Sequence, residues 1–482
     1  MHTLPSTRRQ WLQHAGMGIG GIALQWMLSA QQAGSAPPVL KEKPHRDLLP
    51  RLTHFQPRAK AMISLFQHGG PSHLDLTDPK PELTKHSGSD YPGDIHFSFV
   101  NQASKKLLGS PFTFAPRGEC GTELSELLPH ISGVVDDLCL IRSMHTGANG
   151  HEVSIRYFHG GIPGILGRPT LGSWLTYALG CETQDLPAYM VLSDPGGHPV
   201  DGVTNWSNGF MPAMFQGTVL RPKEPRIFNL QPPPHLTGVV QRQNLDLLQE
   251  MNQVHLEKHP GEAELETRIA SYELAARMQL AATDALDISG ETRATLAMYG
   301  IDQPETSEYG TRCLLARRLI ERGVRFVQLF HAGQPWDNHD SIKTTLPAIC
   351  QKTDKPVAGL VADLKQRGLL ETTLVHWGGE IGRLPVTQEY GDTERAGRDH
   401  NGQGFSIWLA GGGIQGGMAY GKTDEFGHRA VENVVTPNDF QATLMHLFGL
   451  HHDRVHFPYN NILQGITANR PARVVQEILA SR

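Results

Sequence analysis

The sequence predicts an α/β fold with a mostly parallel central sheet and helices on both faces. Short apolar runs typical of buried parallel strands recur along the chain, and helical patterns lie between several of them. Polar, glycine-rich clusters follow most of these runs, where open α/β sheets bind ligands. The expected strands are 61–66, 138–141, 189–192, 324–330, 373–377 and 405–410; the expected helices are 262–286, 308–322, 355–367 and 438–447, with a closing helix after Asn469.

The composition supports a large folded core and excludes several classes of protein. Of the 482 residues, 39% are hydrophobic, which excludes global disorder. The 43 Lys and Arg residues nearly balance the 48 Asp and Glu residues, so we expect no nucleic-acid partner. The five cysteines are scattered, and none has the spacing of a zinc knuckle. The 25 histidines are the unusual feature, because histidine is the commonest metal ligand.

The amino-terminal segment has the features of an export signal. Arg8 and Arg9 precede a Gly/Ala-rich apolar stretch, 15–30, which is too short and too Gly-rich to span a membrane comfortably. Paired arginines resemble a twin-arginine translocation (Tat) signal, which exports folded proteins. We therefore expect the Tat machinery as a partner, a periplasmic or otherwise exported location and no stable membrane span in the mature form. The expected organisation is a signal segment 1–36, a linker 37–60, and one domain 61–482 with a loop-rich insertion near 194–260.

Carboxylates and imidazoles follow or precede several of the expected strands. Asp75 follows the first strand, and Asp337 and His339 lie two residues apart after the strand at 324–330. Such a pair can bind one metal ion from two directions. Glu380 follows the strand at 373–377, and His400 precedes the strand at 405–410. These side chains have the composition of a two-metal hydrolase site.

Two further groups have open roles at this stage. Arg383 can bind an anionic substrate oxygen in bidentate fashion, or it can simply form an ion pair with Glu380. After the strand at 138–141, the sequence offers Ser143, Thr146 and His151. Each of these could be a nucleophile, a ligand or a group that orients the substrate.

Several motifs together resemble one known family. They are the twin arginines, Gly69–Asp75, Asp78–Pro81, Leu315–Leu319 before Gly323–Phe326, Trp336-Asp337, Glu380–Arg383 and Gly397–His400. This set is similar to the domain-of-unknown-function-1501 family of the alkaline phosphatase-like superfamily, which includes sulfatases. The resemblance implies an alkaline phosphatase-like α/β sandwich with one or two divalent metal ions at the carboxyl edge of the sheet.

The resemblance also implies roles for particular residues. Asp337, His339 and His400 resemble a first metal site. Glu380 stands where an Asp–His pair commonly serves a second metal, but Ile381 follows it here, and the first-strand carboxylate is displaced to Asp75. No cysteine lies in the context of the formylglycine motif of sulfatases. Thr146 or Ser143 would attack, or a metal-activated water would do so, or catalysis has been lost.

We therefore expect an exported metal-dependent hydrolase of phosphate or sulfate esters, acting on a small-molecule or glycan ester. The alternative is a non-catalytic envelope protein of the same fold that binds an anionic glycan or another ligand. The expected metal is zinc first, with calcium, magnesium or manganese as alternatives. The expected metal ligands are Asp75, Asp337, His339, Glu380 and His400. The expected catalytic residues are His151 as general acid or substrate-positioning group, Thr146 as nucleophile and Arg383 as anion clamp.

Overall fold

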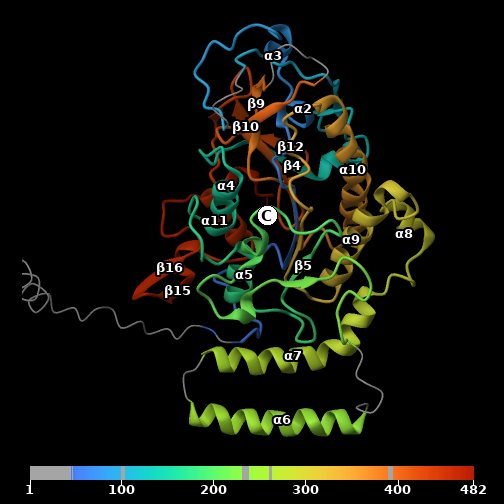
Figure 1. The fold of residues 1–482 in the computed structure, drawn as a ribbon, viewed down its shortest axis with the longest axis vertical. Helices are drawn as coiled ribbons and strands as arrows, with labels where there is room; N and C mark the ends of the chain where they lie inside the picture. The colour runs from blue at the N-terminus through green and yellow to red at the C-terminus, as the bar shows by residue number, and fades with distance from the viewer. Residues whose placement is uncertain are drawn as a thin grey trace, which may run out of the picture. The chain divides into compact units, whose positions relative to one another are not determined.

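An eight-stranded sheet forms the centre of the protein (Figure 1). The structure is a computed structural model, and it describes residues 45, 47–98, 104–230, 238–259, 263–388 and 395–481. The strand order is β12-β4-β11-β8-β1-β7-β5-β6, and every neighbouring pair is parallel except the two that include β11. The prediction of a mostly parallel sheet is confirmed. The strands are β1 Ala61–Phe66, β4 Leu138–Met144, β5 Tyr189–Leu192, β6 Thr218–Leu220, β7 Phe326–Leu329, β8 Thr373–Gly378, β11 Phe405–Ala410 and β12 Met418–Tyr420.

Small two-stranded sheets, ten α-helices and several short 3-10 helices complete the described part of the chain. The two-stranded sheets are β2 Phe114–Arg117 with β3 Thr122–Ser125, β9 Gly382–Thr387 with β10 Arg398–Asn401, β13 Lys422–Thr423 with β14 Ala430–Glu432, and β15 His456–Tyr459 with β16 Ile462–Gly465. The helices are α2 His73–Leu76, α3 Pro81–Lys85, α4 His151–Gly160, α5 Leu171–Leu179, α6 Val239–Lys258, α7 Ala263–Leu286, α8 Arg293–Met298, α9 Pro304–Glu321, α10 Ile342–Gln366 and α11 Pro437–Leu447.

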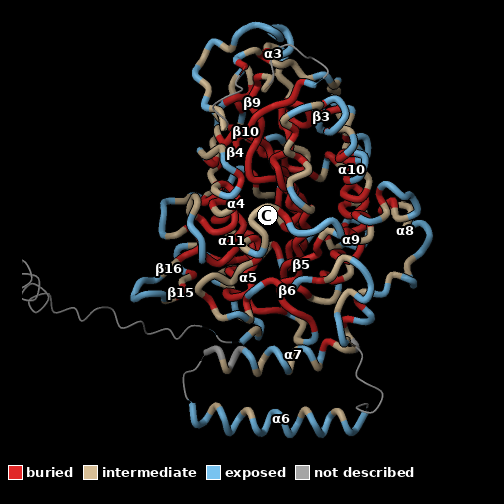
Figure 2. Tube along the Cα trace, in the orientation of Figure 1, coloured by how far each residue is buried: buried red, intermediate tan, exposed pale blue. Residues whose placement is uncertain are grey.

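The two faces of the sheet carry two separate hydrophobic cores. Along β1, Ile63 and Leu65 join the core formed with α9 and α10, whereas Met62 and Phe66 join the core formed with α4, α5 and α11. Successive residues of a strand point to opposite faces, so an all-apolar strand needs a cover on each side. Figure 2 shows the inner strands of this sheet, such as β1 and β8, as buried, between helices that are partly exposed. Helices on both faces are therefore a consequence of the apolar strand sequences.

Three local expectations differ from the structure. The helix expected at 355–367 begins at Ile342, and Pro347 and Pro356 lie inside it. Prolines favour a helix boundary, but the packing of α10 against α9 outweighs their cost here. The closing helix expected after Asn469 is wrong, since the described residues there form only a short 3-10 turn, Gln476–Ile478. The segment expected to be loop-rich contains β6 and the helix α6.

Part of the expected organisation lies outside the described residues. The signal segment 1–36 and residues 37–44 of the linker belong to this part of the chain. Among the described residues, no helix is both long enough and apolar enough to cross a membrane.

Candidate metal centre

Five segments bring polar side chains to one edge of the sheet. Chain segments that follow β1, β4, β7 and β8 leave the sheet at the carboxyl ends of parallel strands, where ligands bind in α/β folds. Asp337 and His339 lie in the loop after β7, and Glu380 lies directly after β8. His400 comes before strand β11 in the sequence. Because β11 runs antiparallel to β8, the amino end of β11 lies at the same edge of the sheet as the carboxyl end of β8. The antiparallel direction of β11 therefore brings His400 to the same edge as Asp337 and Glu380.

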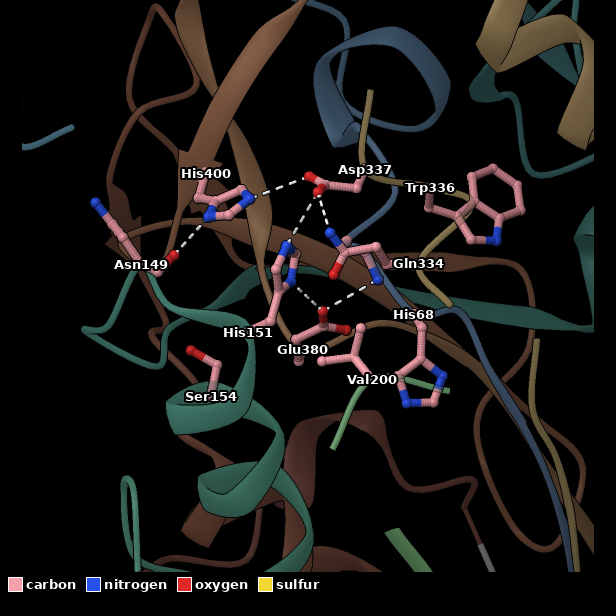
Figure 3. Close-up of polar contacts among 12 residues, drawn as sticks. His68, Asn149, His151, Ser154, Val200, Gln334, Trp336, Asp337, Glu380 and His400 are labelled. Atoms are coloured by element: carbon pink, nitrogen blue, oxygen red, sulfur yellow. Dashed lines mark hydrogen bonds and ion pairs between the residues drawn. The ribbon is translucent and has the colours of Figure 1, made fainter. Parts of the chain in front are cut away.

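Asp337, His339 and His400 bring three ligand atoms together. The Nε2 atom of His339 lies 2.9 Å from Asp337 Oδ1, and the Nε2 atom of His400 lies 3.0 Å from the same oxygen. The two Nε2 atoms are 2.9 Å apart. We call these three atoms the ligand triangle. Figure 3 shows the His400 imidazole directed at the Asp337 carboxylate.

The other ring nitrogens define which tautomer each imidazole adopts. The Nδ1 atom of His400 donates to the backbone carbonyl of Asn149 at 2.7 Å. The Nδ1 atom of His339 donates to the side-chain oxygen of Gln388. A neutral imidazole with its proton on Nδ1 has a lone pair on Nε2. Burial lowers the pKa of His400 and so favours its neutral form, although its bond to Asp337 acts in the opposite direction. The triangle therefore consists of three electron-pair donors that face one another.

A divalent metal ion fits this donor set. Three lone-pair atoms about 3 Å apart repel one another unless a cation or a proton lies between them, and that spacing suits adjacent ligands of one ion. Histidine ligands in metal sites usually donate their second N–H to a carbonyl or carboxylate, which fixes the ring. Asn149 and Gln388 play this part here. Two further groups have ligand atoms within 4.8 Å of one another, namely His151 with Asp337 and His400, and Asp399 with His339 and His400.

Arg383 is buried behind the triangle and holds Asp337 in place. Its guanidinium donates to Asp337 Oδ1 and to the backbone carbonyls of Gly69, Gly70, Trp336 and Arg398. Burial alone would raise the pKa of Asp337, but the charge of Arg383 and the three histidine contacts lower it strongly. The expected role of Arg383 as an anion clamp does not fit this placement, because its donors are already engaged and its side chain is 1% exposed.

Gly69 and Gly70 make the close approach to this loop possible. Both have positive φ angles, 104° and 75°. A Cβ atom at Gly69 would lie 2.6 Å from the backbone nitrogen of Asp337, and one at Gly70 would lie 2.5 Å from the carbonyl oxygen of Ile381. Any larger residue would push these loops apart. Gly69 therefore permits the close approach of the loop that carries Asp337, and Gly70 permits the approach of Ile381.

Within the described part of the chain, Glu380 contacts His151, and no hydrogen bond or ion pair joins it to the triangle. Its Oε1 atom accepts from His151 Nδ1 at 2.6 Å and from the Gly69 backbone N–H at 3.1 Å. His151 Nε2 lies 3.3 Å from Asp337 Oδ2 (Figure 3). Burial opposes a charged imidazole, but the contacts with Asp337 and Glu380 outweigh it and raise the pKa of His151 to about 9. His151 is the first residue of α4, so the helix fixes its backbone.

Asp75 lies in a separate, closed ion pair. Arg398 donates to its two carboxylate oxygens at 2.7 and 3.0 Å, and Ser72 donates to one of them. Both side chains of the Asp75–Arg398 pair are 0% exposed. Because these donors occupy the Asp75 carboxylate, Asp75 is not part of the ligand set that we propose. The sequence predicted Asp75 as a metal ligand because it follows β1.

Thr146 is likewise not brought to the triangle. Its hydroxyl donates to the Ala148 carbonyl at 3.3 Å and accepts from Ser154 at 3.4 Å. The Ser143 hydroxyl donates to the Asn433 carbonyl at 2.7 Å. Among the described residues, neither hydroxyl forms a hydrogen bond with a ligand of the triangle.

Two glutamines of the site were not predicted. Gln388 binds the Nδ1 atom of His339, and Gln334 donates to Asp337 Oδ2 at 2.6 Å. Gln388 lies 49 residues from His339 in the sequence, and no local pattern marks it. Only the pairing of β9 with β10 brings the chain around Gln388 close to Gly397 and the site.

The chain matches the model of a family described as "Protein of unknown function (DUF1501)" over residues 59–479. The protein belongs to this family. No curated protein sequence matches this chain.

Solved structures with a similar fold include sulfatases and members of the alkaline phosphatase superfamily. A sulfatase from Pseudoalteromonas sp. is 13% identical, with 82% of this chain and 68% of that chain covered and a TM-score of 0.34. An alkaline phosphatase superfamily protein from Vibrio parahaemolyticus is 9% identical, with 86% and 72% covered and a TM-score of 0.31. Alkaline phosphatase from the Antarctic bacterium TAB5 is 10% identical, with 77% and 96% covered and a TM-score of 0.30.

Proposed function

We propose that this protein is an exported, metal-dependent hydrolase of phosphate or sulfate esters. The ligand triangle carries this proposal, because Asp337 Oδ1 and two imidazole Nε2 atoms lie within 3.0 Å of one another. Both imidazoles have their Nδ1 protons bound elsewhere, which leaves their lone pairs directed into the triangle.

Asp337, His339 and His400 would hold the ion. Zinc is our first choice, because imidazole nitrogens and a carboxylate oxygen are its usual ligands, with manganese, magnesium and calcium as alternatives. When bound, the ion supplies Lewis-acid stabilisation of the charge that develops on ester oxygens. The His339 side chain is 23% exposed, whereas Asp337 and His400 are 8% and 5% exposed. An ester substrate would therefore reach the triangle from the His339 side.

Export is the second part of the proposal. The paired arginines before the apolar stretch at 15–30 support a Tat signal and a periplasmic location. Because the Tat machinery carries folded proteins, the chain would acquire its ion before it leaves the cell.

Metal content and turnover together test the proposal. The purified wild-type protein and the variants Asp337→Asn and His400→Ala are analysed for bound metal, and then assayed with aryl phosphate, phosphodiester and aryl sulfate esters. We expect about one ion per wild-type chain and turnover that falls by about 100-fold or more in both variants. Wild-type turnover no higher than that of the variants would contradict the proposal.

A non-catalytic role in the cell envelope is the second candidate. The placement of Thr146 and Ser143 favours it, because both hydroxyls are bonded to backbone carbonyls. Four of the five cysteines are buried, so no thiol among these four is open to a substrate. This candidate predicts a bound ion, no turnover of any ester in the panel, and direct binding of a sulfated glycan.

A further inference from the structure

Helix α6 carries a row of exposed apolar side chains. Four of its residues are between 48% and 62% exposed: Val240, Leu247, Met251 and Val254. No residue of α6 is buried, and Figure 2 shows the helix exposed or partly exposed along its length. Single exposed apolar residues are common on protein surfaces, whereas a continuous row of them marks an interaction site. The row on α6 therefore indicates contact with a partner.

The spacing of these residues places them on one side of the helix. Val240 and Leu247 are seven residues apart, and Met251 and Val254 follow at steps of four and three. At 3.6 residues per turn, the four side chains lie within about 60° around the helix axis, and Asn244 lies beside them. We call these five residues the α6 stripe. Its spacing is the heptad repeat of a coiled coil, with Asn244 and Met251 at one core position and the other three at the second.

A different side of α6 packs against the domain. The side-chain amide of Gln241 donates to Gln279 of α7 at 2.7 Å, and α7 in turn packs against α9. Leu245, Asn252 and Leu256 are half-buried as well. Because Gln241 is turned by about 100° from the first residue of the stripe, α7 covers a side of α6 that is separate from the stripe.

We propose that the α6 stripe joins two copies of this protein, and that the two α6 helices pair in parallel as a two-stranded coiled coil. Asn244 favours this partner and this direction. In a parallel pair, each position of the stripe meets the same position of the other copy, so the two Asn244 amides can hydrogen-bond to each other. An antiparallel pair would set Asn244 against an apolar residue and leave its amide unpaired in the interface.

The polar residues of α6 also fit a second copy. In a parallel coiled coil, Glu250 lies across from His255 of the partner subunit, so the imidazole can donate to the carboxylate. A lipid surface is a poorer match, because α6 has three acidic residues against two of Lys and Arg, whereas helices that bind anionic lipid are rich in Lys and Arg. The stripe extends for about 21 Å along the helix. Because an interface of this length is small, we expect a dimer that dissociates on dilution.

Sedimentation of the purified protein from about 1 to about 300 µM tests the association. We expect the wild type to change from monomer to dimer over this range, and Leu247→Glu to raise the Kd of the dimer by about tenfold or more. Val240→Glu and Val239→Glu are a matched pair. Val239 is 72% exposed and is turned by about 100° from Val240, so only Val240→Glu should weaken the dimer.

Disulfide cross-linking tests the direction of the pair. In Val240→Cys, a parallel pair brings the two introduced thiols together, so oxidised glutathione should produce a covalent dimer. An antiparallel pair would place these thiols at opposite ends of the stripe. The wild type keeps the exposed Cys120 and is the control for other disulfides. A dimer of Val240→Cys that forms no such cross-link would overturn the parallel pairing.

Two other results of the sedimentation experiment would overturn the whole proposal. One is a wild type that stays monomeric at every concentration, and the other is a dimer that Leu247→Glu leaves unchanged. A monomeric wild type that sediments with phosphatidylglycerol vesicles would assign the stripe to a lipid surface instead. None of these results bears on metal content or ester hydrolysis, so the dimer and the proposed function stand or fall separately.

Discussion

The Nε2 atoms of His339 and His400 lie 2.9 Å apart, although the two residues are 61 positions apart in the chain. One is in the loop after β7 and the other is in β10. Each ring is held from behind through its Nδ1 atom. Two nitrogen lone pairs this close are unfavourable unless a cation or a proton lies between them, and a cation shared with Asp337 would relieve the repulsion at all three atoms.

Replacing either histidine of this pair should remove the ion. In His339→Ala and His400→Ala, we expect bound metal to fall below the wild-type amount and chelator to stop affecting the melting temperature. An ion present at about 100 times its Kd stabilises the wild type by about 2.7 kcal/mol, so chelator should lower the wild-type Tm. Elemental analysis and melting curves with and without chelator measure this. A wild-type Tm that chelator leaves unchanged would count against a bound ion.

Gln388 should tune the affinity for the ion without being a ligand. Gln388→Ala removes the acceptor of His339 Nδ1 and frees the ring to turn. We expect the affinity to fall by about 10- to 100-fold, as for other groups that orient a ligand. Competition with a chelator of known affinity measures the change. Gln415→Ala is a control on an exposed side chain, and an equal effect of both variants would contradict the prediction.

Arg383 should act on stability and metal binding rather than on substrate affinity. Arg383→Lys keeps the positive charge but loses the planar fork that reaches the carbonyls of Gly69 and Gly70. Leaving these buried carbonyls without donors should destabilise the fold by about 2 kcal/mol or more. Urea unfolding measures this loss. An unchanged unfolding midpoint with a raised KM would instead support the anion clamp expected from the sequence.

The Asp75–Arg398 pair should contribute to stability in a pH-dependent way. Asp75→Asn leaves a buried Arg398 without its counter-charge, which should cost about 3–5 kcal/mol at neutral pH. Burial would raise the pKa of Asp75, but Arg398 outweighs it and lowers the pKa in the folded protein. The contribution is therefore complete above the unfolded pKa of about 3.9 and is lost as the pH falls below it.

Unfolding of the wild type and Asp75→Asn across this range measures the effect. The difference between their free energies of unfolding should be constant from about pH 5 to pH 7 and should shrink below about pH 4. A difference that grows on acidification would show that the carboxyl pKa is raised rather than lowered.

The paired arginines should be needed for export. Replacing Arg8 and Arg9 with lysines keeps the charge but removes the twin-arginine motif, so we expect the protein to remain in the cytoplasm. Fractionation of cells that express each version, followed by immunoblotting, measures this. Unchanged export would remove the Tat assignment and leave the metal site unaffected.

The sequence by itself determined the sheet and the edge at which a site would form. The expected bounds of β1, β5 and β11 agree with the structure. Buried strands are marked by local apolar runs, and ligands follow the ends of parallel strands, so both features can be read from neighbouring residues. Asp337 and His339 were predicted as ligands for the same reason, because they follow a strand, whereas His400 precedes one.

Only the tertiary structure decided which polar groups meet. Asp75 follows a strand as Asp337 does, but Arg398 closes around it. Arg383 lies in a site-like motif, yet backbone carbonyls from distant loops occupy its donors. Contacts of this kind depend on the order and direction of the strands. His400, for example, reaches the site because β11 is antiparallel to β8. Strand order and strand direction are not encoded in the spacing of nearby residues. The sequence predicted the sheet edge at which the candidate site lies, because strand ends can be recognised locally. The partner of each side chain depends on long-range packing, which the local sequence does not show.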